Sequence, residues 1–223
     1  MNKLLFSRPQ KNRALPVICV CVGQVIWGFS YLFTRIAQRS ASPTVVLSMR
    51  FLASWVIMTA LIWSGKKSFS LKGKNFRPLL ALALLEPPYY FFESYGVYYS
   101  NATFAGTVMA FAPVVGILAA MLFLGEKPTR RQKIFSLLPT AGVIIITSVG
   151  SSMGIVKPLG AIFLFASQIV AAGMKLYNKK SSEEFSSFER TYAIVVANAI
   201  IFTIKSMIDL HGDVRAYAAP LGN

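Results

Sequence analysis

Seven apolar stretches, each about long enough to cross a bilayer, constrain this chain more than any motif. The hydrocarbon core of a membrane is roughly 30 Å thick, and a helix needs about 20 apolar residues to cross it. The stretches occupy residues 15–37, 44–64, 78–98, 104–124, 134–150, 158–177 and 191–208. Only short gaps separate them. The sequence therefore predicts an all-α polytopic membrane protein with the lipid bilayer as its surroundings.

The basic residues follow the same alternation, which predicts an orientation. Of the 23 lysines and arginines, 16 lie in the N-terminal tail and in the second, fourth and sixth gaps, while the opposite gaps hold three. Because positive charge favours the cytoplasmic side, we expect residues 1–14 to be a cytoplasmic tail of a multi-pass protein of the plasma (inner) membrane. A net charge of +15 distributed by topology in this way argues against nucleic acid as a partner.

Two segments of the chain resemble each other at a fixed offset. Residues 23–35 read GQVIWGFSYLFTR and residues 167–179 read SQIVAAGMKLYNK, so that a shift of 144 residues aligns Gln24 with Gln168 and Ser42 with Ser186. The second copy lies five predicted helices after the first. An odd number places the second copy in the opposite orientation, which is the inverted repeat common among secondary transporters.

The offset also predicts an organisation for the chain. Two such copies would make a ten-helix protein of five plus five helices, about twice the repeat offset in length. Residues 15–150 would form the first five-helix repeat, and residues 158–223 would begin the second. A chain that ends at Asn223 would be either a fragment of this plan or a reduced form of it, and we expect a fragment.

Three passages resemble the EamA-like family of the drug/metabolite transporter superfamily. The strongest is ESYGVYYSNATFAG followed by AFAPVVGILAAMLFLGEKPTRRQ and AGVIIITSVG, within residues 93–150. WGFSYLFTR and VVLSMRFL resemble the first two helices of that family. The resemblance implies a ten-helix inner-membrane carrier that moves small metabolites, amino acids or drugs, often outward. Helices eight to ten of that plan would follow residue 223.

Charged residues inside the stretches need a reason, since each costs about 2.5–3.5 kcal/mol at the centre of a span. With a rise of 1.5 Å per residue, Arg50 and Glu93 both lie roughly 7–9 Å below the same membrane surface. Arg35 lies nearer that surface. We therefore predict an intramembrane ion pair of Arg50 with Glu93, and Arg35 as a second partner. The pair would either align the helices or serve as a gate or anion contact.

Glu86 lies close to mid-depth without an opposite charge at its level. Pro87 and Pro88 follow it and remove two helical amide donors, which predicts a kinked or unwound helix. Tyr90 and Glu93 share a face with Glu86 at i+4 and i+7. This group is a candidate for binding a proton or a substrate. The alternative is a protonated carboxyl hydrogen-bonded for packing.

Amide side chains near the middle of other stretches suggest a shared cavity. Gln24, Gln168 and Asn198 lie on the first, sixth and seventh stretches, and Tyr31 follows Gln24 at i+7. Each amide could merely join two helices. Several polar groups at one depth predict instead a wet central hollow that holds a small-molecule substrate.

A secondary transporter that works by alternating access is therefore the predicted function, with export as the expected direction and protons as a candidate coupling ion. The alternatives are a non-transporting membrane partner and an inactive truncated transporter. An intramembrane enzyme is not expected, because His211 lies outside the stretches and nothing positions a nucleophile. Neither a metal nor a cofactor is predicted, and the oligomeric state is left open.

Overall fold

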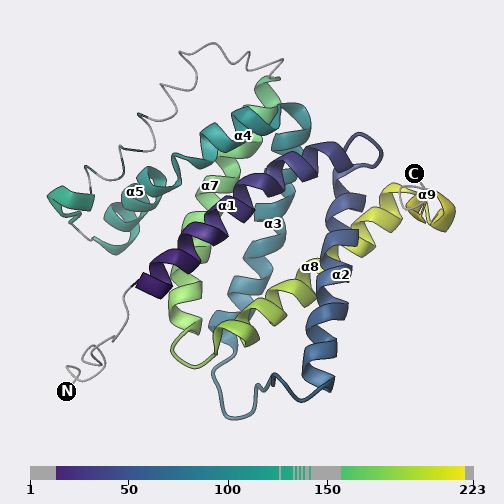
Figure 1. Ribbon diagram of the computed structural model, residues 1–223, viewed down its shortest axis with the longest axis horizontal. Coiled ribbons are helices and arrows are strands. Elements are labelled where there is room, and N and C mark those ends of the chain that lie inside the picture. Colours follow the sequence, from purple (N-terminus) through teal and green to yellow (C-terminus); the bar gives the residue numbers. More distant parts are fainter. Residues whose placement is uncertain are drawn as a thin grey trace.

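The computed structural model describes residues 14–125, 127–132 and 157–218, together with residues 134, 136, 138 and 141. This part of the chain is helical and holds no strand (Figure 1). Its helices are α1 (Ala14–Ala37), α2 (Pro43–Trp63), α3 (Arg77–Tyr99), α4 (Ala102–Met109), α5 (Ala112–Leu124), α7 (Pro158–Ser181), α8 (Ser187–Asp209) and α9 (Val214–Ala218). Four of them, α1, α2, α7 and α8, are long and apolar enough to cross a membrane. The all-helical class and the membrane character are confirmed.

The predicted span at 104–124 is two helices rather than one. Helix α4 ends at Met109 and α5 begins at Ala112. Pro113 has no amide hydrogen to donate to the Met109 carbonyl, so one helical hydrogen bond is missing at the break. The backbone tightens instead, and the Phe111 amide donates to the Val108 carbonyl at 3.0 Å. The predicted span at 134–150 lies almost entirely outside the described residues.

Helix α3 excludes one of two expected alternatives, a kinked or an unwound helix. It is continuous from Arg77 to Tyr99 and contains Pro87 and Pro88 within it, so the helix is not unwound there. The two prolines still remove amide donors to the carbonyls of Ala83 and Leu84. Helix α3 packs closely along both α7 and α8. Neighbouring helices of this kind let a helix keep its course through proline.

The end of α1 and the start of α7 meet at the end of α3, which we name the Tyr99 end. Arg35 Nη1 donates to the Tyr98 carbonyl at 2.8 Å. The Lys157 amide donates to the Tyr99 carbonyl at 3.0 Å. Because α1 ends where α7 begins, the two helices run in opposite directions (Figure 1).

The opposite side of the bundle, which we name the Lys74 end, gathers the α2–α3 loop and the α7–α8 turn. Lys74 Nζ pairs there with a Glu189 carboxylate oxygen at 2.6 Å, and the Asn75 amide donates to Glu184 at 2.6 Å. Eight basic residues of the described loops and helix ends lie at this end: Lys66, Lys67, Lys72, Lys74, Arg77, Lys179, Lys180 and Arg190. Arg35, Arg39 and Lys157 lie at the Tyr99 end. One face of the molecule is therefore much more basic than the other.

The sequence offset also aligns the structural boundaries. A shift of 144 residues carries α1, Ala14–Ala37, onto α7, Pro158–Ser181, at both ends. The same shift carries Ser42 onto Ser186, and each is the N-cap of the following helix, α2 or α8. The two equivalent helices α2 and α8 pack against each other. The bounds of α1 and the N-cap of α2 therefore coincide with those of α7 and α8 after the shift, and α1 and α7 run in opposite directions.

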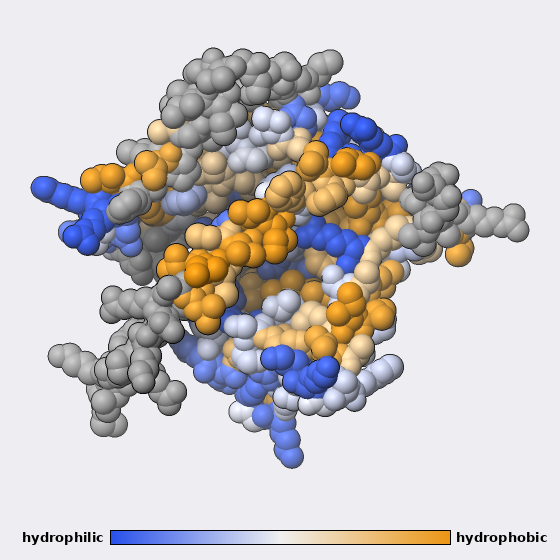
Figure 2. All heavy atoms as spheres, viewed as in Figure 1, coloured by the Kyte–Doolittle hydropathy of each residue, from blue (hydrophilic) through white to orange (hydrophobic). Residues whose placement is uncertain are grey.

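Packing is dense on one side of this arrangement and sparse on the other. Leu47 and Phe51 of α2 form a buried cluster with Val195, Ala199 and Phe202 of α8. Helix α1, in contrast, exposes apolar side chains along most of its length, and Figure 2 shows this hydrophobic band crossing the face diagonally. Exposed apolar surface of this kind is suited to lipid.

Candidate functional site

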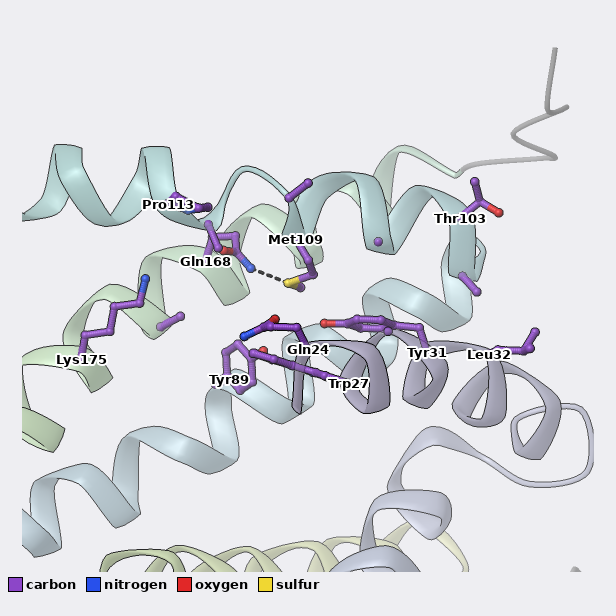
Figure 3. Close-up of a pocket in the computed structure, with 16 residues that line it drawn as sticks. Gln24, Trp27, Tyr31, Leu32, Tyr89, Thr103, Met109, Pro113, Gln168 and Lys175 are labelled. Atoms are coloured by element: carbon purple, nitrogen blue, oxygen red, sulfur yellow. Dashed lines mark hydrogen bonds between the residues drawn. The ribbon is translucent and has the colours of Figure 1, made fainter. Parts of the chain in front are cut away.

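A cavity of about 930 Å³ lies between α1, α3, α4, α5 and α7 (Figure 3). Its volume is in the range of small-molecule sites, which are mostly apolar with few polar groups. The wall follows this pattern: its residues are Gln24, Trp27, Gly28, Tyr31, Leu32, Tyr89, Ala102, Thr103, Gly106, Met109, Ala110, Ala112, Pro113, Gln168, Ala171 and Lys175. The helices thus leave a hollow of ligand size beside α1, which we name the main cavity.

The two repeat-related glutamines face the main cavity from antiparallel helices. Gln168 is 3% exposed and its Nε2 lies 2.6 Å from the Met109 sulfur, as the dashed line in Figure 3 shows. Gln24 lines the opposite wall on α1. Two amides with equivalent places in the repeat therefore border the same space, where each can donate and accept hydrogen bonds.

A smaller cavity of about 440 Å³ adjoins the main cavity, and Glu86 lines it. Trp27, Tyr89, Ala171 and Lys175 line both cavities. The Glu86 side chain is 8% exposed, and no hydrogen bond or ion pair joins it to the described residues. A carboxyl group that borders a hollow and lacks a fixed partner is free to bind a proton or a ligand.

Glu93 is satisfied by two tyrosines. The Tyr31 hydroxyl donates to Glu93 Oε1 at 2.9 Å, and the Tyr89 hydroxyl donates to the same oxygen at 2.7 Å. All three side chains are buried. Since Tyr31 belongs to α1 and Glu93 to α3, this contact fastens the sparsely packed helix to the centre of the bundle.

The predicted ion pair of Arg50 with Glu93 is not formed in the described structure. Both side chains border a small gap of about 10 Å³, yet the ion pairs among the described residues are Lys74–Glu189 and Lys205–Asp209. The Arg50 guanidinium lies over the Tyr90 ring, 5.3 Å from its centroid. The tyrosine hydroxyls take the place that the arginine was expected to fill. Arg35, the expected second partner, instead binds a backbone carbonyl at the Tyr99 end.

The two remaining predicted site residues, Tyr90 and Asn198, differ in whether they line a cavity. Tyr90 lines the smaller cavity. Asn198 is fully buried in α8, where its Nδ2 donates to the Ile194 carbonyl at 2.8 Å, and it lines neither cavity. Its Oδ1 has no hydrogen-bond partner among the described residues. Gln24 and Gln168 therefore border the main cavity and Glu86 borders the smaller one, whereas Asn198 borders neither.

Lys175 and Tyr89 are two polar lining residues that were not among the predicted site residues. A lysine six residues before the end of α7 is expected to extend toward the headgroups. Lys175 lines both cavities instead. Two signals could have found it, since Lys175 follows Gln168 at i+7 and the 144-residue shift aligns it with Tyr31. Within the described ranges, no group of three His, Cys, Asp or Glu side chains is placed to hold a metal ion.

Helices long enough to span a membrane, packed around a hollow of small-molecule size, define the class as a multi-pass membrane protein. Residues 14–148 match the EamA-like transporter family, and the chain belongs to that family. It therefore stands among the membrane transporters.

Several relatives agree with this assignment. The chain is similar to the uncharacterized transporter YcxC of Bacillus subtilis, with 30% identity over 94% of this chain and 69% of the relative. It is also similar to an uncharacterized transporter of Archaeoglobus fulgidus, with 22% identity over 89% of this chain and 71% of that one. The uncharacterized inner membrane transporter YedA of Escherichia coli is 25% identical over 82% of this chain and 59% of its own length. No solved structure matches the chain.

Proposed function

We propose that this chain is a secondary transporter that moves small metabolites, amino acids or drugs by alternating access, and that the main cavity is its substrate site. The observation that carries the proposal is the placement of Gln24 and Gln168, which stand at equivalent positions of antiparallel helices and border one hollow. Two similar halves of opposite orientation can exchange shapes, so that one site opens to each side in turn.

The proposal extends to topology and direction. The strongly basic Lys74 end faces the cytoplasm of the plasma membrane, as the positive-inside rule requires. The described helices belong to a plan of five plus five, with residues 15–150 as the first repeat and residues 158–223 in the second. Export is the direction that the family resemblance favours.

Coupling to protons is assigned to Glu86. Its carboxyl borders the smaller cavity, and the titratable or charged side chains that share this cavity are Tyr89, Tyr90, Lys175 and Arg190. Arg190 donates to the Asn178 carbonyl at 3.0 Å, so it is engaged elsewhere. An ionisable group inside a membrane bundle without a fixed counter-charge is suited to carry a proton through the transport cycle.

Proteoliposomes that contain a pH-sensitive dye test this proposal. Pools of small metabolites and drugs are added to the full chain, and compound-dependent proton movement is recorded. We expect movement with the wild-type chain and none with Glu86→Gln, while Glu183→Gln, an exposed turn position, behaves as wild type. Binding without any flux would favour a non-transporting membrane partner. Unchanged flux in Glu86→Gln would remove this carboxyl from the coupling mechanism.

A further inference from the structure

Lys175 is the one charged side chain that lines the main cavity within the described part of the chain. It is joined to no described residue by a hydrogen bond or an ion pair. Glu86 and Arg190 line the smaller cavity with it, yet neither pairs with it. Lys175 is exposed rather than buried, so its ammonium group is accessible within the hollow that it lines. It is therefore placed to receive a negative charge from a ligand.

The neighbouring helix leaves room for the ammonium group. In Figure 3 the Lys175 side chain points from α7 toward α5. A Cβ atom built on Gly116 of α5 would lie 3.0 Å from Lys175 Nζ, which is closer than ordinary contact. The absence of a side chain at Gly116 thus lets the charged group lie against α5 at the cavity wall.

The rest of the wall limits what the ligand can be. Trp27, Tyr31, Leu32 and Met109 present mainly apolar surface, and the amides of Gln24 and Gln168 are neutral. A single ammonium balances a single negative charge. A doubly charged phosphate would leave one charge unpaired in apolar surroundings, which is strongly unfavourable. A carboxylate attached to an apolar or aromatic body matches both the charge and the wall.

We infer that Lys175 is the anion contact of the main cavity and that the ligand is a small monocarboxylate with an apolar or aromatic body. This inference rests on the proposed function, which makes the main cavity the substrate site. It adds the class of substrate and the residue that selects it.

Three probes of one shape test the inference: hydrocinnamate, its primary amide and the corresponding primary amine. Their affinities for the full chain in detergent are measured by titration calorimetry at neutral pH. We expect the carboxylate to bind about ten-fold or more tightly than the amide, and the amine to bind weakest, because a charge-assisted contact is stronger than a neutral one.

Variants assign that preference to one side chain. Lys175→Met should remove the preference of carboxylate over amide, and Lys175→Arg should keep most of it. Gly116→Ala leaves the lysine in the chain and requires its ammonium group to shift by only a few tenths of an ångström, so any loss of affinity should be small and should affect the carboxylate more than the amide. Lys179→Met, at the end of the same helix, is the matched control and should behave as wild type.

The outcomes separate the two proposals. A carboxylate preference that persists in Lys175→Met overturns the inference, as does binding of none of the three probes. Loss of thermal stability in Lys175→Met with unchanged selectivity would make the residue structural. In each of these cases, compound-dependent flux in the Glu86 experiment would leave the proposed transport function standing.

Discussion

Helices α1 and α7 have bounds that coincide after a shift of 144 residues, but their surroundings differ. Helix α7 packs closely along α3, whereas α1 makes few contacts with any helix. In their membrane-spanning windows, 22% of the residues of α7 are buried and 6% of those of α1. Two helices of matching length and position in the sequence offset therefore differ in how deeply they are packed.

The difference lies in how each helix meets α3. Helix α7 approaches α3 at two glycines, since a Cβ on Gly96 would lie 2.6 Å from Leu164 and a Cβ on Gly160 would lie 2.9 Å from the Tyr99 carbonyl carbon. Small residues of this kind let helix backbones approach closely in membranes. Helix α1 is held by side chains that reach across, chiefly Tyr31 to Glu93. The main cavity is therefore bordered by α7, which packs closely against α3, and by α1, which is held to α3 by a few side-chain contacts.

The largest effect should come from filling the close contact of α7. Gly160→Ala places a methyl group against the backbone at Tyr99, which cannot move cheaply, and should destabilise the fold by about 1–3 kcal/mol. Gly23→Ala on α1 meets nothing within 4 Å and should not destabilise the fold, because alanine favours a helix over glycine. Thermal unfolding in detergent measures both. Equal melting temperatures for the two variants would contradict a tight α7 contact and a free α1.

A smaller effect should follow from cutting the link that holds α1. Tyr31→Phe removes the hydrogen bond to Glu93 and should weaken the attachment of α1 by about 1 kcal/mol or more. Hydrogen–deuterium exchange along α1 should rise several-fold. Tyr89→Phe is the matched control, because it removes a hydrogen bond to the same oxygen from within α3. If both variants loosen α1 equally, the tyrosine link is not what secures it.

The smallest effect concerns the helices that follow. Ser186 caps α8 in a complete capping box with Glu189, whereas its counterpart Ser42 makes no side-chain cap bond to α2. Ser186→Ala should cost about 1 kcal/mol of stability and Ser42→Ala only a few tenths. Unfolding measurements on the two variants compare the copies directly. A greater loss at Ser42 would reverse the order that the structure predicts.

Much of the fold could be predicted from the sequence because the bilayer dictates span length. The stretches at 15–37, 44–64, 78–98 and 158–177 lie within a few residues of observed helices, and the repeat offset that aligns Gln24 with Gln168 also aligns helix boundaries. Hydropathy reports length and burial in lipid, which are properties of a whole segment. It does not report how a helix bends, so the break before Pro113 could not be predicted from it.

The site was harder to predict from the sequence, because it depends on how each helix is rotated about its axis and on which of several possible partners each polar side chain contacts. Depth alone suggested Arg50 as the partner of Glu93, but two tyrosine hydroxyls bind the carboxylate instead. Lys175 was not predicted because a lysine near a helix end normally extends toward the surface. Its direction depends on the missing side chain at Gly116, which is distant in sequence.

The break between α4 and α5 has a mechanical consequence. Ala105 and Val108 of α4 are buried in a cluster with Tyr31, Val97 and Leu164, which anchors that half of the wall. The half that carries Gly116 is joined to it only through residues 110–111, and a short non-helical joint can absorb a change of backbone angle. A rotation of α5 about residues 110–111 would widen or narrow the main cavity near Lys175, while the wall near Tyr31 stays in place.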